Sequence, residues 1–157
     1  MGYAPLKPLP LVRELERVVK PGGSVAILAW SSEKFLPGYP LLEAHLQATT
    51  AGLAPFVVGK APESHFLRAL GWFRDAGLVD ATAHAFARAV HAPLGDELRG
   101  ALAALFGMRW PGVEAELAPE DWEAFQRLCL PESPEFIVDS PDYCAFFTYT
   151  MFKGRVI

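Results

Sequence analysis

The histidines can act as bases or metal ligands, and their spacing limits which of these roles is open. The chain has four. On one strand His84 and His91, seven positions apart, point to opposite faces and cannot share a metal ion. His45 stands alone on an expected helix. His65, directly after Ser64, is either a general base, which must lie within hydrogen-bond reach of its substrate, or a partly exposed polar residue at a helix start.

The cysteines, serines and tyrosines allow fewer kinds of chemistry. Cys129 and Cys144 form neither a metal-ligand spacing nor a disulfide framework, so both are expected to be buried reduced thiols. No Gly-x-Ser-x-Gly motif supports a serine triad. Tyr143 and Tyr149 share one face of an expected strand. Their hydroxyls can recognise a substrate, or their rings can simply pack.

The charge of the chain, −4 in total, is unevenly distributed. One segment, residues 111–142, has nine acids and a single base, Arg127. This segment is interpreted as a solvated helical face, with a cation site as the alternative. No stretch combines clustered Lys and Arg with aromatic residues, which argues against a nucleic-acid partner. The nine acids are Glu114, Glu116, Glu120, Asp121, Glu123, Glu132, Glu135, Asp139 and Asp142.

Length and composition favour one domain over residues 1–157. The chain is 52% hydrophobic and 12% aromatic, enough for a sizeable core. Its longest purely apolar run, Val25 to Trp30, has the length of a strand and is too short to cross a membrane. No basic-then-apolar signal segment opens the sequence, so we expect a cytoplasmic protein without a membrane partner.

Apolar periodicity predicts alternating helices and strands in the first half. Residues 1–10, with three prolines, are expected to be an extended lead-in. A helix follows over 11–20 and ends at Pro21-Gly22-Gly23, where Gly permits a positive φ. Residues 24–30 are a continuous apolar run, typical of a strand covered on both faces. Residues 31–40 are expected to be a loop.

The remaining elements follow from caps, apolar stripes and alternation. Helices are predicted from Pro40 to Gly52, and from Ser64 as N-cap to Gly77, with Phe66, Leu67, Leu70 and Phe73 as the second helix's apolar stripe. Strict alternation predicts a strand over 79–91. Two further helices, 95–106 and 119–130, precede an aromatic and β-branched strand over 143–152. The fold class is therefore α/β with about three main strands.

Residues 11–30, Leu-Val-Arg-Glu-Leu-Glu-Arg-Val-Val-Lys-Pro-Gly-Gly followed by Ser-Val-Ala-Ile-Leu-Ala-Trp, resemble a segment of class I S-adenosylmethionine-dependent methyltransferases of the type 11 or type 25 kind. There a helix ending in Leu-Lys-Pro-Gly-Gly leads into the fifth strand of a doubly wound sheet. Residues 66–79, with Phe-Arg-Asp-Ala-Gly-Leu, resemble the next helix, and 142–154 resemble the antiparallel last strand. The resemblance implies an incomplete Rossmann-like fold with a helical insertion at about 93–141.

The sequence departs from this family where the cofactor binds. The family uses a Gly-rich loop after the first strand and an acid at the end of the second. Neither has a counterpart here, since Gly22-Gly23 follows a helix instead of opening one. The chain is therefore expected to be the C-terminal half of such an enzyme, without cofactor-binding residues and without a metal site. A natural short protein and a truncation both fit.

The missing half would leave the strand at 24–30 with an open side. An apolar unpaired edge is a template for pairing with another chain. We therefore expect a homodimer formed through the exposed strand 24–30, by strand pairing or by exchanged elements.

The resemblance also implies where a substrate would bind, because the segment after the family's fifth strand lines the acceptor pocket. Trp30, Ser31, Phe35 and Tyr39 inherit that position, and His65, Tyr143 and Tyr149 are further candidates; packing aromatics are the alternative. The parent reaction would be methyl transfer from S-adenosylmethionine to a small molecule. This chain alone is expected to be inactive and to bind no cofactor. The alternatives are a non-catalytic, homodimeric small-molecule-binding module, or a subunit that completes a separately encoded N-terminal half.

Overall fold

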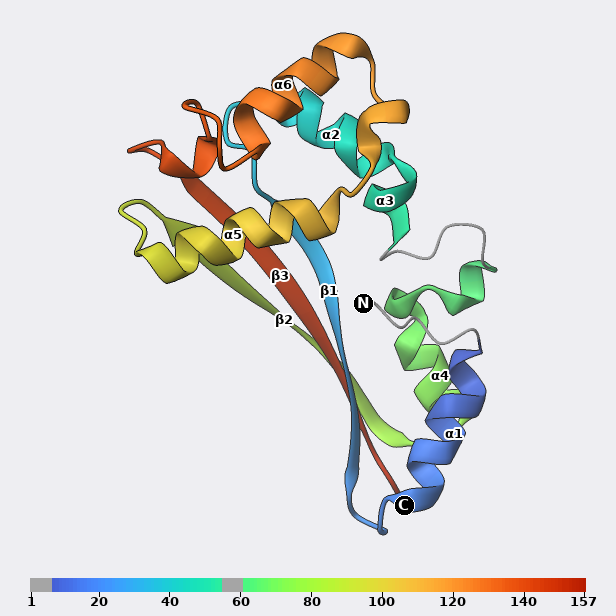
Figure 1. Ribbon diagram of the computed structural model, residues 1–157. Helices are drawn as coiled ribbons and strands as arrows, with labels where there is room; N and C mark the ends of the chain where they lie inside the picture. The colour runs from blue at the N-terminus through green and yellow to red at the C-terminus, as the bar shows by residue number, and fades with distance from the viewer. Residues whose placement is uncertain (1–6, 55–60) are drawn as a thin grey trace. The chain divides into compact units, whose positions relative to one another are not determined.

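A three-stranded sheet forms the framework of the chain. The structure is a computed structural model and describes residues 7–54 and 61–157. Strands β1 (Ser24–Lys34), β3 (Cys144–Arg155) and β2 (Val79–His91) are hydrogen-bonded in that order (Figure 1). At one end of β3 the Val156 N–H donates to Gly23 O, and at the other the Ala92 N–H donates to Tyr143 O. These bonds make β3 antiparallel to both neighbours, so β1 and β2 run in the same direction at the two edges.

Contacts divide the described residues into two compact units. The first comprises 7–32, 61–87 and 148–157, and the second comprises 33–54 and 88–147. All three strands pass from one unit into the other. The helical segment expected at about 93–141 lies within the second unit.

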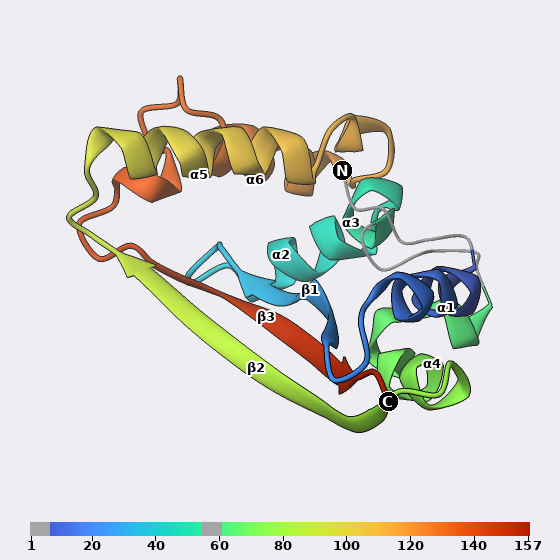
Figure 2. The ribbon, with the colours of Figure 1, turned by 90° about the horizontal axis from the view of Figure 1, so that it is seen from below.

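The first unit packs two helices on its part of the sheet. α1 (Pro8–Val18) and α4 (Ala69–Asp75) lie side by side (Figure 2). Their apolar faces close over the strands, and Phe73 is fully buried among Val12, Val25 and Phe152. The turn from α1 into β1 needs glycine, because Gly22 has a φ of +79°.

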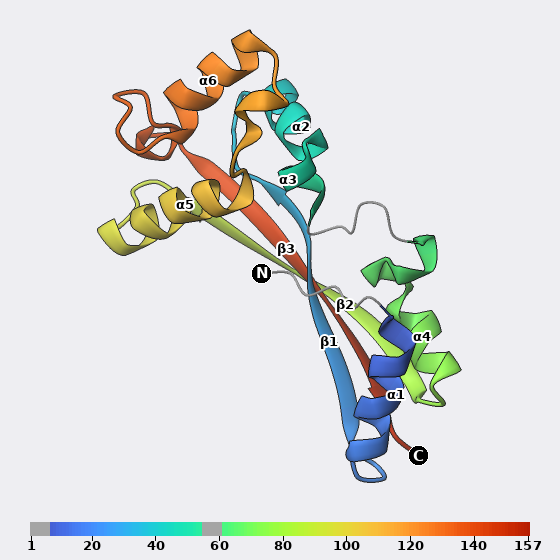
Figure 3. The same ribbon diagram turned by 45° about the vertical axis from the view of Figure 1, so that its right-hand side comes forward.

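The second unit is built from the last residues of β1 and β2, the first residues of β3 and four helices. These are α2 (Pro40–Ala48), α3 (Thr50–Leu53), α5 (Asp96–Arg109) and α6 (Pro119–Cys129), with α2 beside α6 (Figure 3). A short 3₁₀ turn at Val113–Ala115 lies between α5 and α6, and another at Ile137–Asp139 lies between α6 and β3. The core is aromatic: Phe106 lies 5.6 Å from Trp110 and 5.8 Å from Phe35, measured between ring centroids.

The structure confirms an α/β fold with three main strands, the last of them antiparallel. The strand predicted over 79–91 has those bounds in β2, where alanine recurs at every second position from 81 to 89. Pro40 begins α2 as predicted, since its missing N–H costs nothing at a first helical position. That helix ends at Ala48, however, and Thr49 caps the next one by accepting a hydrogen bond from the Gly52 N–H.

Two predictions in the first half were wrong. The extended lead-in ends earlier than predicted: α1 begins at Pro8, which occupies its first position as proline commonly does, while residues 1–6 lie outside the described residues. The loop predicted over 31–40 begins only after Lys34. The strand continues through the polar residues 31–34, Ser-Ser-Glu-Lys, which are not typical of a buried strand. Glu33 is buried there in an ion pair.

The helix predicted from Ser64 to Gly77 was also partly wrong. Two 3₁₀ turns, Pro62–Ser64 and Phe66–Arg68, precede α4, and the side chain that accepts the capping bond is His65. Leu67 and Leu70 of the predicted stripe are exposed, whereas Ala69 and Trp72 are buried. The tighter 3₁₀ turns shift the phase of the side chains, so a single 3.6-residue period fails here.

We predict that Gly154→Ala destabilises the chain, because Gly154 lies against the first unit's core. An added Cβ would meet Phe73 Cδ2 at 3.0 Å and Leu78 Cβ at 3.1 Å. Overpacking of this kind costs about 1–3 kcal/mol, measurable by urea unfolding. Gly107→Ala in α5 is the control: it meets nothing within 4 Å and should stabilise by about 0.5–1 kcal/mol. A Gly154→Ala variant as stable as the parent would contradict this packing.

Candidate functional site

A buried ion pair holds the chain where it leaves β1. Arg109 at the end of α5 donates from Nε to Glu33 Oε1 at 2.7 Å, and the two side chains are 6% and 2% exposed. Gln47 of α2 donates to the same carboxylate oxygen at 2.7 Å, and Arg109 Nη1 donates to the carbonyl of Ala51 in α3 at 3.1 Å. Arg109 Nη2 also donates to the Gln47 side-chain oxygen. The network joins β1, α2, α3 and α5 around a single carboxylate.

A second buried carboxylate fixes the residues that follow. Glu43 of α2 is 1% exposed and accepts the backbone N–H of Phe35 at 2.5 Å. Lys34 supplies a countercharge, with Nζ 3.6 Å from the other carboxylate oxygen. With Phe35 and Leu36 buried, the loop that follows is anchored at its start.

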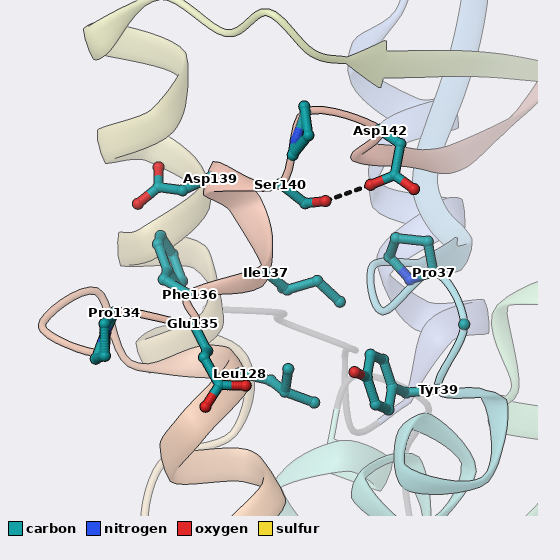
Figure 4. A pocket seen from close by; sticks show the side chains of 12 residues that line it. Pro37, Tyr39, Leu128, Pro134, Glu135, Phe136, Ile137, Asp139, Ser140 and Asp142 are labelled. Carbon is teal, nitrogen blue, oxygen red and sulfur yellow. Dashed lines mark hydrogen bonds between the residues drawn. The ribbon is translucent and has the colours of Figure 1, made fainter.

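That loop lines a cavity of about 610 Å³ (Figure 4). Three segments form the walls: the loop between β1 and α2, the end of α6, and the segment that leads into β3. In the figure the Tyr39 ring lies across from Leu128, and Ile137 projects between the walls. The lining residues are Pro37, Gly38, Tyr39, Leu128, Pro134, Glu135, Phe136, Ile137, Asp139, Ser140, Pro141 and Asp142.

The lining is apolar and acidic. Glu135 pairs with Arg127 at 2.8 Å, and Asp139 takes two bonds from Arg99, one of them at 2.6 Å. The hydrogen bond to Arg99 holds the pKa of Asp139 below its usual range. Asp142 bonds to the Ser140 hydroxyl, and it is the one lining carboxylate without an arginine partner in the described part of the chain. Among the described residues, no Lys, Arg or His lines this cavity, so the lining favours a neutral or cationic ligand over an anion.

Tyr39, Phe35 and Tyr143 all belong to the second unit, and only Tyr39 lines the cavity. Phe35 is fully buried against Phe106. Tyr143 is 1% exposed, and its hydroxyl has no hydrogen-bond partner among the described residues. Burial raises the pKa of this phenol. These two aromatics therefore pack in the core, the alternative that the sequence left open.

Trp30, Ser31 and Tyr149 meet in the first unit. The rings of Trp30 and Tyr149 lie with centroids 5.6 Å apart on neighbouring strands. Ser31 Oγ lies 2.9 Å from Thr148 Oγ1 on the same pair of strands. These three predicted pocket residues thus form cross-strand pairs, which contribute to sheet stability.

His65 has a structural role in the local chain. Its Nδ1 accepts the Leu67 N–H at 3.3 Å, and its ring stacks on Phe66 at 4.6 Å. These contacts cap a 3₁₀ turn, as a polar residue at a helix start does.

His45 is not alone, contrary to the sequence analysis. Its Nδ1 lies 2.6 Å from Asp121 Oδ2 of α6, and both line a cavity of about 320 Å³ together with Glu116. A protonated Nδ1 donates to the carboxylate and leaves Nε2 as a proton acceptor. The imidazole is 46% exposed, so small molecules can reach it. The partners are 76 positions apart in the sequence, so no local pattern indicated the pair.

The two cysteines differ, although both were expected to be buried. Cys129 is 1% exposed, and burial, with a smaller contribution from Glu43, raises the pKa of its thiol to about 12. Cys144 is exposed at the start of β3. The alternation of that strand turns Cys144 outward and Ala145 inward.

The glycine pair at the start of β1 does not fit S-adenosylmethionine. A dinucleotide-type loop needs free backbone N–H groups facing the ligand. Here the Gly22 N–H donates to Val156 O at 3.0 Å and the Gly23 N–H to Lys20 O at 2.9 Å. The first bond joins the chain to the end of β3 and the second closes the turn between α1 and β1, so neither donor is free for a ligand.

Comparison with known proteins gives no family assignment. No family model matches the chain, and a search of curated proteins finds no match either. Within residues 7–54 and 61–157, no group of three or more His, Cys, Asp or Glu side chains is placed to hold a metal ion. None of the helices in that part of the chain is long and apolar enough to span a membrane.

We predict that Ellman's reagent labels one thiol per native chain at pH 8. With a pKa of about 12, roughly one Cys129 side chain in ten thousand is a thiolate at that pH, and it is also closed off from solvent. Exposed Cys144 should react quickly. Cys144→Ser should remove native labelling, and guanidinium chloride should release the second thiol. Fast labelling of native Cys144→Ser would contradict the buried placement of Cys129.

Proposed function

We propose that this chain is the C-terminal part of a class I methyltransferase fold, and that the cavity beside Tyr39 is its acceptor pocket. One observation carries the proposal: the segment directly after β1 lines a cavity of about 610 Å³. In the family that the sequence resembles, the segment after the fifth strand lines the acceptor site. The volume suits a small organic molecule.

The course of the chain around β1 adds support. α1 leads through Lys20-Pro21-Gly22-Gly23 into β1, with Gly22 in the left-handed region. α4 then leads into β2, which is parallel to β1, and β3 runs against both. Successive parallel strands joined through helices are the unit of doubly wound sheets. The antiparallel closing strand agrees with the same resemblance.

In this proposal the chain's own residues bind and orient the acceptor. The ring of Tyr39 and the side chain of Leu128 supply apolar contact, and Asp142 accepts a hydrogen bond from a hydroxyl or ammonium group of the ligand. Glu135 and Asp139 are engaged by their arginine partners, and these ion pairs hold the walls of the cavity in place. We expect no methyl transfer by this chain alone, because its glycine turn does not fit the cofactor.

The glycine turn that does not fit S-adenosylmethionine also favours a second candidate function. A homodimeric, non-catalytic module that binds small molecules would use the same cavity without any cofactor. Both functions require a small molecule to bind in the cavity, so this binding is tested first. Binding of S-adenosylmethionine by the chain then distinguishes a methyltransferase from a non-catalytic module.

We predict that tyramine binds in the cavity and that 4-hydroxyphenylacetate, which has a similar size and opposite charge, does not. The lining carboxylates and the absence of a lining base cause the difference. Two-dimensional NMR titration should shift the amides of residues 37–39 and 134–142. Asp142→Asn should weaken tyramine binding roughly three- to ten-fold.

The exposed Asp75→Asn variant in the first unit is the matched control and should bind tyramine as the parent does. Equal binding of tyramine and 4-hydroxyphenylacetate would show that this cavity is not the acceptor pocket. Amide chemical-shift changes on tyramine addition that are confined to other residues would show the same. S-adenosylmethionine, titrated calorimetrically in the same samples, should give no binding at about 1 mM. Micromolar affinity for S-adenosylmethionine would contradict the expectation that this chain alone binds no cofactor.

A further inference from the structure

The two edge strands of the sheet are protected to different degrees. Residues 24–32 of β1 include no charged side chain. β2 has Asp80 and Arg88 along its length, and Asp80 also has a left-handed φ of +55°, which bends the start of that edge. Charges and backbone irregularities are the usual protection of an edge against pairing, and an edge without them is a template for another strand.

The backbone of β1 offers hydrogen-bonding groups on its open side. Gly23 uses its carbonyl to pair with Val156 on β3. In an antiparallel ladder alternate residues bond to the same neighbour, so Ala26 and Leu28 direct their N–H and C=O groups away from β3. Leu28 is also 63% exposed, although it is apolar.

An apolar stripe on α1 extends this edge into the helical layer. Arg13 reaches the Asp75 carbonyl at the end of α4 at 3.4 Å, which identifies the flank of α1 that faces α4. Leu11 and Val18 lie on the opposite flank at helical spacing, and they are 44% and 58% exposed. In Figure 2 α1 lies toward β1 and α4 toward β2, so the flank of α1 that faces away from α4 is on the same side of the first unit as the open edge of β1.

We infer that a second copy of this chain covers this surface, with β1 pairing antiparallel to the partner's β1 and the two α1 helices meeting through Leu11 and Val18. A two-fold axis brings the same surface of each copy together. Because residues 24–32 are uncharged, self-pairing brings no like charges into contact in any register. A charged partner would find no complementary charge along this strand.

The size of the surface agrees with a dimer. Nine strand residues extend about 30 Å, and one strand plus one helix make a strip about 20 Å high. Each copy then buries about 600 Å², or about 1,200 Å² in total, which is the lower end of stable interfaces. The inference rests on the edge and the stripe of this chain by itself; in a complete methyltransferase fold of the kind proposed above, a preceding strand would pair with the same edge instead.

The test is the mass of the chain in solution, measured by size-exclusion chromatography with light scattering. The parent chain should have the mass of a dimer at about 100 µM, and its mass should fall toward that of the monomer on dilution. Leu28→Lys should raise the dimer dissociation constant roughly ten-fold or more, because it places like charges across the axis. Phe86→Lys is the matched control: Phe86 is 53% exposed on the other edge strand, and its replacement should leave the mass unchanged.

Val18→Lys on α1 provides a second test that leaves the strand intact, and it should also favour the monomer. Circular dichroism should be the same for all four chains. In hydrogen exchange, the amides of Ala26 and Leu28 should become protected as concentration rises, whereas those of Ala83 and Ala85, which face the open side of β2, should not. A parent chain that stays monomeric at about 100 µM, or a dimer broken by Phe86→Lys and left intact by Leu28→Lys, would overturn the inference.

Discussion

The buried pair of Glu33 and Arg109 determines how the chain leaves its first strand. A carboxylate closed off from water is costly unless a cation and hydrogen-bond donors stabilise it, and here a guanidinium and the Gln47 amide both donate to its Oε1. Because Arg109 also bonds to the Ala51 carbonyl, one side chain ties the strand to three helices. The segment that reaches the cavity begins two residues later, so the position of the Pro37–Tyr39 loop depends on this pair. The apolar part of β1 packs in the first unit, and its charged end is anchored in the second.

Ion pairs of the helical segment provide the other links within the second unit. The acidic run over 111–142 was interpreted as a solvated face, yet several of its members bind specific groups of the same chain. Asp121 bonds to His45, and Glu116 accepts the Thr50 N–H at 2.7 Å. Asp139 and Glu135 pair with arginines beside the larger cavity. Exposed pairs of this kind add little stability each, so their main effect is on the orientation of the segments that line the two cavities.

Local patterns predicted much of the secondary structure, and long-range contacts explain the rest. β2 was predicted with its observed bounds because alanine recurs at every second position from 81 to 89. The end of β1 was missed because the burial of Glu33 depends on Arg109, 76 positions away, and no local pattern reports such a partner. The apolar stripe predicted for the helix at 64–77 was partly wrong because 3₁₀ turns before α4 changed which side chains face the core. Among the candidate site residues, Tyr39 could be placed from its position after the strand, whereas His45 and Asp121 come together only through the packing of α2 against α6.

A double-mutant cycle on Glu33 and Arg109 tests most directly whether this pair holds the second unit together. Unfolding by urea would be measured for Glu33→Leu, Arg109→Leu and the double variant. Each single change leaves one buried group without its partner and should cost about 3–5 kcal/mol, while the double variant should cost far less than the sum of the two. Single variants close to the parent in stability, or costs that simply add, would show that the pair does not control the course of the chain after β1.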